Sequence, residues 1–489
     1  MTDADCEIEL KFTCGPEDLA AVLAAAPPGD DETRELISVY FDTPDLALQK
    51  AGASLRVRES DGRRTQTLKR GDGLVREEFE AAIDGLAPDP DLGPLPKLVP
   101  EGASLRPAFN VRVSRRQRSF RYGGAQIELA LDQGEATAGE QQTPICEVEL
   151  ELKSGPPGAL FDLAREFAAA APLYLSYDSK ANRGQALVAG EPDAPRKSSR
   201  VELVKDATVG ETFQAVARKA LAQIAANAAT LRVKPEAEAV HQLRVGARRF
   251  RSALSTFKPA LEGAGFEAVK EDFKWLARSC DAPRNLDVFS EETLRPAEQV
   301  EDRQAGLAPL RKAIDAARRR AWIEAAQTVS SERFRTLMIN AAAWVETGEW
   351  RGGEGAGAPI DSFAPRALKK HLKKVEKLGR DPEGADDVAL HHLRIEAKKL
   401  RYAIEAFESL YGKRRIKRFL RPVKDLQEVL GALNDLATAR PLLAGLALPS
   451  AAALAAGQLI GQKAAAKPQL VSRAVAALDD LKDAKTFWR

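Results

Sequence analysis

The stretch Glu147-Val148-Glu149-Leu150-Glu151-Leu152-Lys153 alternates charged and aliphatic side chains without interruption. Successive side chains of a β-strand point to opposite faces, so this pattern predicts a strand with one charged and one apolar face. A shorter copy, Glu7-Ile8-Glu9-Leu10-Lys11, lies near the N-terminus. Carboxylates in one row repel each other unless positive charge lies between them. If the two strands pair, they form an acidic wall of the kind that binds hard divalent cations.

Length and composition limit the number of domains and the classes of protein that the chain can form. A chain of 489 residues suggests two to four domains, and the 44% hydrophobic share is enough to build their cores. There is no apolar run of 18 residues and no apolar signal core at the N-terminus, so we expect no transmembrane helix. The four cysteines, Cys6, Cys14, Cys146 and Cys280, have neither CxxC nor zinc-site spacing. They indicate free thiols in a reducing cytoplasm.

Charge divides the chain into two halves. Residues 1–195 hold 21 Lys and Arg against 34 Asp and Glu, a net charge of −13. The other 294 residues hold 52 against 37, a net charge of +15. An acidic half joined to a basic half predicts different partners for each, metal ions for the first and a polyanion for the second.

The first 195 residues read as an antiparallel β-domain. Besides the two acidic strands, strand-like runs occupy 37–41, 54–58, 66–70, 75–83, 110–122 and 126–132, with Gly- and Asp-rich turns between several of them. Helices are predicted at 16–26, 158–171 and 179–187. Charged side chains recur on one face of nearly every strand, which favours a closed barrel with a charged lumen over a sandwich with one wet face.

These runs resemble, in order, the blocks of CYTH domains, the triphosphate tunnel metalloenzymes. The segments that carry the resemblance are Glu7–Lys11 (the ExExK signature), Tyr40–Thr43, Leu55–Arg58, Thr67–Arg70, Glu128–Asp132, Glu147–Lys153 and Ser179–Gly184. The resemblance covers essentially all of residues 1–190. It implies an eight-stranded antiparallel barrel that forms a tunnel, with Mg²⁺ or Mn²⁺ as cofactor and triphosphate as substrate.

The resemblance also implies roles for individual residues. The implied metal ligands are Glu7, Glu9, Glu147 and Glu149, helped by Asp132 and Glu151. The implied triphosphate ligands are Lys11, Arg56, Arg58, Lys69, Arg116, Arg118, Lys180 and Arg183. The implied catalytic set is Glu7, Glu9, Lys11, Glu147 and Glu149. These residue types suit the chemistry, because Arg binds phosphate in a bidentate fork and a divalent ion neutralises phosphate charge. No Walker A motif is present to offer another phosphate site.

Residues 189–199 are a linker rich in Pro, Ser and charge, and a helical region follows. It contains an internal repeat at an offset of 150, in which His241–Phe257 matches His391–Phe407. A Gly-rich stretch at 348–358 separates the copies. The repeat predicts two similar helical bundles related by a pseudo-two-fold axis, with halves at about 205–347 and 360–489.

Each repeat copy carries a stripe of cations at helical spacing. His241, Arg244, Arg248 and Arg251 share one helix face. His391, Arg394, Lys398 and Arg401 repeat the arrangement. A single stripe of this kind is ordinarily a solvated surface, but its duplication favours anion binding.

The repeats resemble the CHAD domain over about residues 205–485. That family implies two four-helix bundles and inorganic polyphosphate as a ligand. The residues implied for polyphosphate are His241, Arg244, Arg248, Arg249, Lys274, His391, Arg394, Lys398, Lys399, Arg401 and Lys424. The first copy departs from the family's LGxxRD block, since Asp281 and Asn285 replace its Gly and Asp, whereas Gly431 and Asp435 keep the pattern in the second.

The sequence thus predicts an α+β protein with a tunnel domain at 1–195 and a helical domain at 200–489. The expected activity is metal-dependent hydrolysis of inorganic triphosphate to pyrophosphate and phosphate, in the cytoplasm or at polyphosphate granules. Adenylate cyclase, thiamine triphosphatase and nucleoside or RNA triphosphatase activities would use the same tunnel residues. Two non-enzymatic alternatives are a polyphosphate-binding scaffold and a nucleic-acid binder. The second is disfavoured because the basic stripes lack aromatic stacking residues.

Overall fold

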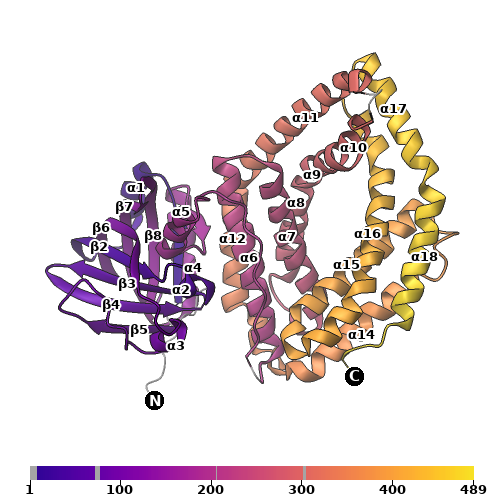
Figure 1. Cartoon of the computed structure of the whole chain (residues 1–489). Helices are drawn as coiled ribbons and strands as arrows, with labels where there is room; N and C mark the ends of the chain where they lie inside the picture. Colours follow the sequence, from indigo (N-terminus) through magenta and orange to yellow (C-terminus); the bar gives the residue numbers. More distant parts are fainter. Residues whose placement is uncertain (1–7, 72–76, 205, 301–303, 489) are drawn as a thin grey trace. The chain divides into compact units, whose positions relative to one another are not determined.

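The computed structural model describes residues 8–71, 77–204, 206–300 and 304–488. Two compact units make up the chain. The first comprises Met1–Pro195 and Ser331–Thr347, and the second comprises Arg196–Ser330 and Gly348–Arg489. Figure 1 shows both units and labels most of their helices and strands.

The first unit is built on one antiparallel sheet. Its nine strands are β1 (Ile8–Thr13), β2 (Asp30–Asp42), β3 (Ala53–Ser60), β4 (Arg63–Arg70), β5 (Glu77–Ala82), β6 (Arg106–Tyr122), β7 (Ala125–Ala138), β8 (Gln141–Ser154) and β9 (Tyr174–Ser176). They lie in the order β5-β4-β3-β2-β6-β7-β8-β1-β9. The predicted antiparallel sheet is confirmed, but the count of eight strands is corrected to nine, because the short strand β9 adds to the edge of β1.

The first and last of the predicted strands pair directly. In the β1–β8 ladder, Lys11 lies opposite Glu149 and Glu9 lies opposite Glu151. The intervening aliphatic side chains Leu10, Val148 and Leu150 are buried on the other face. The alternation in the sequence is therefore realised as one charged and one apolar face.

Helices bury both faces of this sheet. Helices α1 (Leu19–Ala25) and α4 (Pro157–Ala170) pack against each other, and α4 also contacts β7 and β8. On the charged face, α5 (Lys180–Val188) contacts β6, β7 and β8. Two short helices, α2 (Ala47–Lys50) and α3 (Leu95–Leu98), contribute Leu48 and Leu95 to a further apolar cluster with β3 and β4.

A helix distant in sequence completes the first unit. Helix α12 (Glu332–Thr347) packs against α4, and the Arg165 Nε donates to the Asn340 side chain at 2.8 Å. The predicted tunnel domain, residues 1–195, did not include this helix.

The second unit is helical, as predicted. Its longer helices are α6 (Val209–Val233), α7 (Ala237–Phe257), α8 (Phe266–Ser279), α9 (Asp281–Phe289), α11 (Gln304–Ser330), α14 (Ile360–Leu378), α15 (Asp387–Ala406), α16 (Lys413–Ala444), α17 (Ser450–Ala465) and α18 (Lys467–Asp483). The described residues include four α-helices of only four residues, α10 (Arg295–Glu298) and α13 (Glu354–Gly357) here and α2 and α3 in the first unit. The matching repeat segments form α7 and α15, which pack against each other. Within the described ranges, no helix is both long and apolar enough to cross a membrane.

The two repeat copies differ where the sequence departed from the family block. In the second copy α16 runs without interruption through Gly431. In the first copy α8 ends at Ser279 and α9 begins at Asp281. Pro283 lies in the first turn of α9, where its missing N–H costs nothing. The break turns the Asp281 carboxylate towards Arg244, 2.5 Å away.

Candidate functional site

Three buried carboxylates form the centre of the charged face. Asp132 lies opposite Glu147 in the β7–β8 ladder, and Glu149 follows two residues along β8. One oxygen of each lies within 4.8 Å of the others. Asp132 and Glu147 are fully buried and Glu149 is 8% exposed. Buried carboxylates at this spacing require positive charge between them.

Four cations supply that charge. Lys180 Nζ lies 2.6 Å from Asp132, 2.5 Å from Glu147 and 2.8 Å from Glu149. Lys11 Nζ lies 2.9 Å from Glu149. Arg115 donates to both Asp132 oxygens at 2.7 and 2.6 Å and to Glu149 at 2.5 Å, and Arg183 lies 2.9 Å from Glu147. Four positive and three negative groups leave the cluster at +1.

These contacts fix the charge states. Burial alone would raise the pKa of Glu149, but Lys11, Lys180 and Arg115 lower it well below its usual range. Burial alone would lower the pKa of Lys180, but Glu149, Glu147 and Asp132 raise it. Glu149 and Lys180 are therefore both ionised at neutral pH.

The donor set fits a hard divalent cation. All three acidic groups offer carboxylate oxygens, which Mg²⁺ and Mn²⁺ prefer to nitrogen or sulfur. Glu147 Oε1 is buried and has no hydrogen-bond partner, although Arg183 lies at ion-pair distance from it. The lone pairs of Glu147 Oε1 are thus only partly satisfied by other groups of the protein.

The other predicted metal ligands extend the same row. Glu9 and Glu151 lie opposite each other on the charged face, and Glu128 lies opposite Glu151 on β7. Glu151 contacts Lys153 at 2.5 Å. Glu7 lies outside the described residues.

Two predicted arginines lie beyond the carboxylates. Arg58 donates to Ser38 Oγ at 3.3 Å, and burial together with the charge of Arg56 lowers its pKa to about 10. Burial alone would raise the pKa of Tyr40, but Arg56 and Arg58 lower it. The Arg56 Nε is buried without a hydrogen-bond partner. This end of the face therefore carries positive charge that the protein compensates only partly.

Lys69 lies towards the end strand of the sheet. Its ammonium pairs with Glu78 of β5 at 2.8 Å, and both side chains are about one-third exposed. Lys69 thus has a counter-ion of its own.

The structure corrects the prediction for β6. Arg116 and Arg118, predicted as triphosphate ligands, lie on the opposite face of the strand, where both bind the Asp31 carboxylate. Arg118 also donates to the carbonyl oxygens of Leu23 and Pro27 beside α1.

Arg115, and not Arg116 or Arg118, lies on the charged face of β6. It lies opposite Asp132 in the β6–β7 ladder. Val111 and Val113, four and two residues earlier, are buried on the same face. Counting in steps of two from these valines reaches Arg115 and not Arg116, so alternation in the sequence groups Arg115 with the valines without identifying their face as the site.

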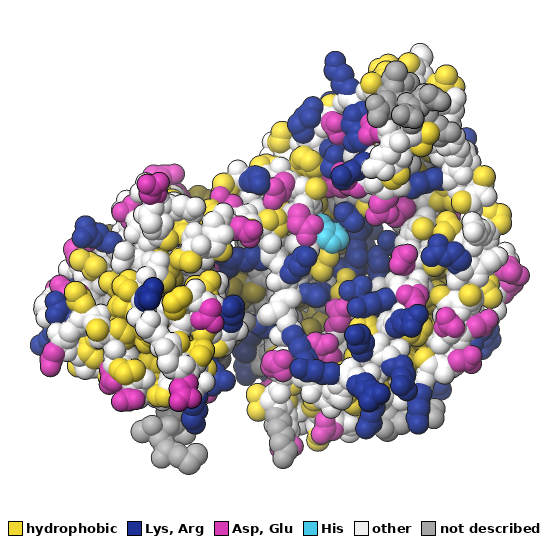
Figure 2. Space-filling view, viewed as in Figure 1, with side chains coloured by type: hydrophobic (Ala, Val, Ile, Leu, Met, Phe, Trp, Pro, Cys, Tyr) yellow, Lys and Arg dark blue, Asp and Glu magenta, His cyan; other side chains and the backbone are white. Residues whose placement is uncertain are grey.

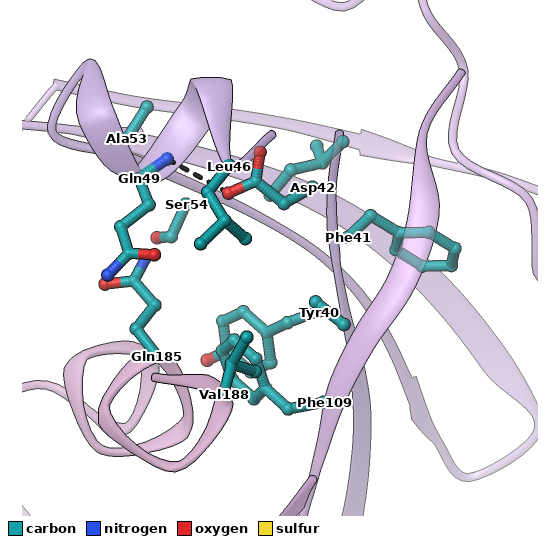
Figure 3. Close-up of a pocket in the computed structure, with 12 residues that line it drawn as sticks. Tyr40, Phe41, Asp42, Leu46, Gln49, Ala53, Ser54, Phe109, Gln185 and Val188 are labelled. Atoms are coloured by element: carbon teal, nitrogen blue, oxygen red, sulfur yellow. Dashed lines mark hydrogen bonds between the residues drawn. The ribbon is translucent and has the colours of Figure 1, made fainter. Parts of the chain in front are cut away.

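Tyr40 and Phe109 belong to the buried apolar cluster that includes Val111 and Val113. The rings of Tyr40 and Phe109 stack at 4.5 Å. Figure 3 shows them beside Gln49 and Gln185, whose side-chain ends approach each other. The cavity among these residues measures about 10 Å³, room for about one water molecule.

A second charged site lies in the helical unit, between the two repeat copies. Burial and the charges of Arg248, Arg394 and Arg244 lower the pKa of Lys398 to about 5. Burial lowers the pKa of Arg394 to about 10, with Arg248 and Arg244 adding to the effect and Asp435 opposing it. The Arg394 Nε is buried and has no hydrogen-bond partner. We call Arg244, Arg248, Arg394 and Lys398 the repeat cluster.

The histidines lie next to this cluster. Burial and Arg284 lower the pKa of His241 to about 4, so its imidazole is neutral. His391 is exposed, and its Nδ1 lies 2.8 Å from Asn434 Oδ1. Figure 2 shows Lys and Arg side chains gathered around a hollow in the helical unit.

The remaining predicted polyphosphate residues are dispersed. Arg249 and Lys424 line a separate cavity of about 310 Å³. Arg401 pairs with Glu405, Lys399 with Glu396 and Lys274 with Glu271, at 2.7 to 2.9 Å. Of the predicted set, the repeat cluster is the part whose charges face one another.

Both sites lie in segments that match known domain families. A CYTH domain model matches residues 5–185 and a CHAD domain model matches residues 215–444. An inorganic triphosphatase from Haemophilus influenzae is 33% identical over 200 residues, covering 37% of this chain and 54% of that protein. The chain therefore spans about half the length of this relative.

Solved structures also match. The crystal structure of the CHAD domain from Ricinus communis is 28% identical, with a TM-score of 0.54, and covers 60% of this chain and 99% of that one. A putative adenylate cyclase from Bacillus halodurans is 20% identical, with a TM-score of 0.28, and covers 36% of this chain and 96% of that one. Residues 5–185 therefore contain a CYTH domain, and residues 215–444 contain a CHAD domain.

Proposed function

We propose that the CYTH domain hydrolyses inorganic triphosphate to pyrophosphate and phosphate with Mg²⁺ or Mn²⁺. The observation that carries this proposal is the buried group of Asp132, Glu147 and Glu149, each paired with Lys or Arg. Triphosphate carries about four or five negative charges at neutral pH, so a site for it needs several cations as well as a metal.

Asp132, Glu147 and Glu149 are the residues that would hold the metal, with Glu9 and Glu151 further along the row. When bound, the ion supplies Lewis-acid charge that stabilises the phosphate oxygens. The resting ion pairs keep Lys11, Arg115 and Lys180 charged and oriented before substrate arrives. Such preorganised charges act on the transition state without the cost of reorientation.

The attacking water needs an acceptor beside the terminal phosphorus. Glu147 Oε1 is buried without a hydrogen bond and can accept one from that water. In-line attack then breaks the bond to the bridging oxygen and gives phosphate and pyrophosphate. Arg56 and Arg58 lie along the charged face beyond the carboxylates, where they can bind the rest of the substrate.

The substrate is proposed from the matching relative, because the protein from Haemophilus influenzae that is 33% identical over 200 residues is named an inorganic triphosphatase. We therefore place inorganic triphosphate before ATP, RNA ends and thiamine triphosphate, which would bind to the same carboxylates and cations.

We also propose that the CHAD domain binds inorganic polyphosphate through the repeat cluster. Burial and mutual repulsion depress the pKa values of Lys398 and Arg394, a cost that a bound polyanion would relieve. In this proposal residues 1–195 carry hydrolysis and residues 200–489 carry binding.

The hydrolysis proposal is tested with Glu149→Gln in the full chain. Glu135, an exposed residue of β7, provides the matched control Glu135→Gln. We expect Glu149→Gln to weaken Mn²⁺ binding and reduce phosphate release by at least 100-fold, and Glu135→Gln to match the wild type. Wild-type turnover by a folded Glu149→Gln would refute the site. No turnover by the wild type would make the protein a binding scaffold.

A further inference from the structure

Two of the free cysteines face each other on the sheet. Cys14 follows β1 and Cys146 lies in β8, and their Sγ atoms are 3.7 Å apart. The Cys14 N–H donates to the Cys146 carbonyl oxygen at 3.4 Å, which continues the β1–β8 ladder by one residue. The two cysteines are therefore direct cross-strand partners although 132 positions separate them.

This placement suits a covalent link. Hydrogen-bonded partners in an antiparallel pair have Cα atoms about 5.5 Å apart, inside the range of about 4.4 to 6.8 Å that disulfides require. Both cysteines are partly exposed, whereas Cys280 is fully buried. A small soluble oxidant can thus reach the pair without unfolding of the sheet.

The pair lies behind the acidic centre. Cys146 immediately precedes Glu147, but successive side chains alternate, so the sulfur points to the face opposite the carboxylate. A link between the sulfurs would tie the backbone of β8 to β1 at the start of the acidic run and leave the carboxylates uncovered.

We propose that Cys14 and Cys146 form a reversible disulfide, with glutathione disulfide or a similar small disulfide as oxidant. One cysteine sulfur attacks the oxidant, which forms a mixed disulfide and releases one glutathione. The other sulfur then attacks the mixed disulfide at the protein sulfur, which forms the Cys14–Cys146 bond and releases the second glutathione. Two thiols are oxidised, one disulfide is reduced, and the two thiol protons leave on glutathione.

The test uses the full chain in glutathione buffers of increasing oxidised fraction. Trypsin places the four cysteines in separate peptides, with Cys14 in 12–34 and Cys146 in 122–153. We expect free thiols to fall from four to two, a linked 12–34/122–153 peptide to appear, and dithiothreitol to reverse both changes. Four free thiols at every ratio, or a link to Cys6 or Cys280 instead, would overturn the proposal.

Variants separate this pair from the other cysteines. Cys280→Ser should form the link as the wild type does. Cys14→Ser should lose the linked peptide and leave Cys146 with at most one glutathione. If the bond ties the strands, amide hydrogen exchange in residues 8–14 and 146–152 should slow on oxidation in the wild type but not in Cys14→Ser. Equal exchange rates in oxidised and reduced wild type would show that no covalent link holds the two strands together.

Discussion

Arg115 and Arg116 are neighbours in sequence and lie on opposite faces of β6, so they form a matched pair for mutation. Arg115 donates to Asp132 and Glu149, whereas Arg116 binds Asp31 on the other face. We expect Arg115→Met to lower kcat/KM for inorganic triphosphate by about 10- to 150-fold, since hydrogen bonds to charged groups contribute about 1.5–3 kcal/mol. Arg116→Met should stay within about twofold. Steady-state phosphate release measures both.

Equal losses in the two variants would contradict the placement of the site on the Arg115 face. Arg115→Met also removes a counter-charge from Asp132, so its fold must be checked by circular dichroism. Arg115→Lys keeps the positive charge and should recover part of the activity. Recovery by Lys separates loss of charge from loss of structure.

The error at β6 shows what the sequence could and could not provide. Alternation separates the residues of a strand into two faces, but it does not say which face is the site when both are buried. On β6 the apolar residues change face, from Val111 and Val113 on the charged side to Phe120 on the other. On β8 the charged and apolar residues alternate without changing face. The prediction therefore placed Glu147 and Glu149 on the same face, where the structure also has them.

Lys398 provides a pH test of the repeat cluster. Its pKa is lowered to about 5, so it is mostly neutral at pH 7 in the free protein. A bound polyanion would raise the pKa towards the usual value of about 10.4, so binding takes up a proton. Affinity should therefore rise as pH falls from 8 to 6, by up to about tenfold per unit for one proton.

Polyphosphate affinity at constant ionic strength, by calorimetry or fluorescence anisotropy, measures this slope. The control is Lys398→Met, which removes the titrating group and should flatten the slope while leaving the titration of the ligand itself. The same slope in wild type and variant would show that Lys398 does not contact the ligand.

Among the elements, α5 packs on the charged face of the sheet against β6, β7 and β8. It places Lys180 and Arg183 over the carboxylates, and Gly184 lets it lie against β6. A Cβ added at Gly184 would overlap the Phe109 ring. We expect Gly184→Ala to displace α5 and lower kcat/KM by at least tenfold, since displacements of about 1 Å can cost about 100-fold.

The control for this element is Gly158→Ala in α4, where an added Cβ meets nothing within 4 Å. It should keep full activity, because Ala is the better helix former. Wild-type activity in Gly184→Ala would mean that α5 does not position the cations.

Sequence patterns predicted α5 as a helix but not the side chain beneath it. The contact between Gly184 and Phe109 joins residues 75 positions apart, and local periodicity carries no information about such pairs. The strand β9 was missed for a related reason. With only three residues, Tyr174–Ser176, it is too short for a period-2 pattern and is defined by pairing with β1.

At the scale of the whole molecule, the charge division predicts two separable activities. The carboxylate cluster and the repeat cluster belong to different units and share no residue. Arg248→Gln with Arg394→Gln should weaken polyphosphate binding by at least tenfold and keep triphosphate hydrolysis within about twofold. Glu149→Gln should do the reverse. Loss of both activities in either variant would contradict the assignment of one activity to each unit.

The substrate preference of the 489-residue chain distinguishes hydrolysis of inorganic triphosphate from the alternative activities. Phosphate release is measured with Mg²⁺ or Mn²⁺ for inorganic triphosphate, ATP, thiamine triphosphate and long-chain polyphosphate side by side, with the products identified. We expect inorganic triphosphate to be hydrolysed fastest, to equal amounts of pyrophosphate and phosphate. A cyclic product from ATP, or no turnover of any substrate, would contradict it.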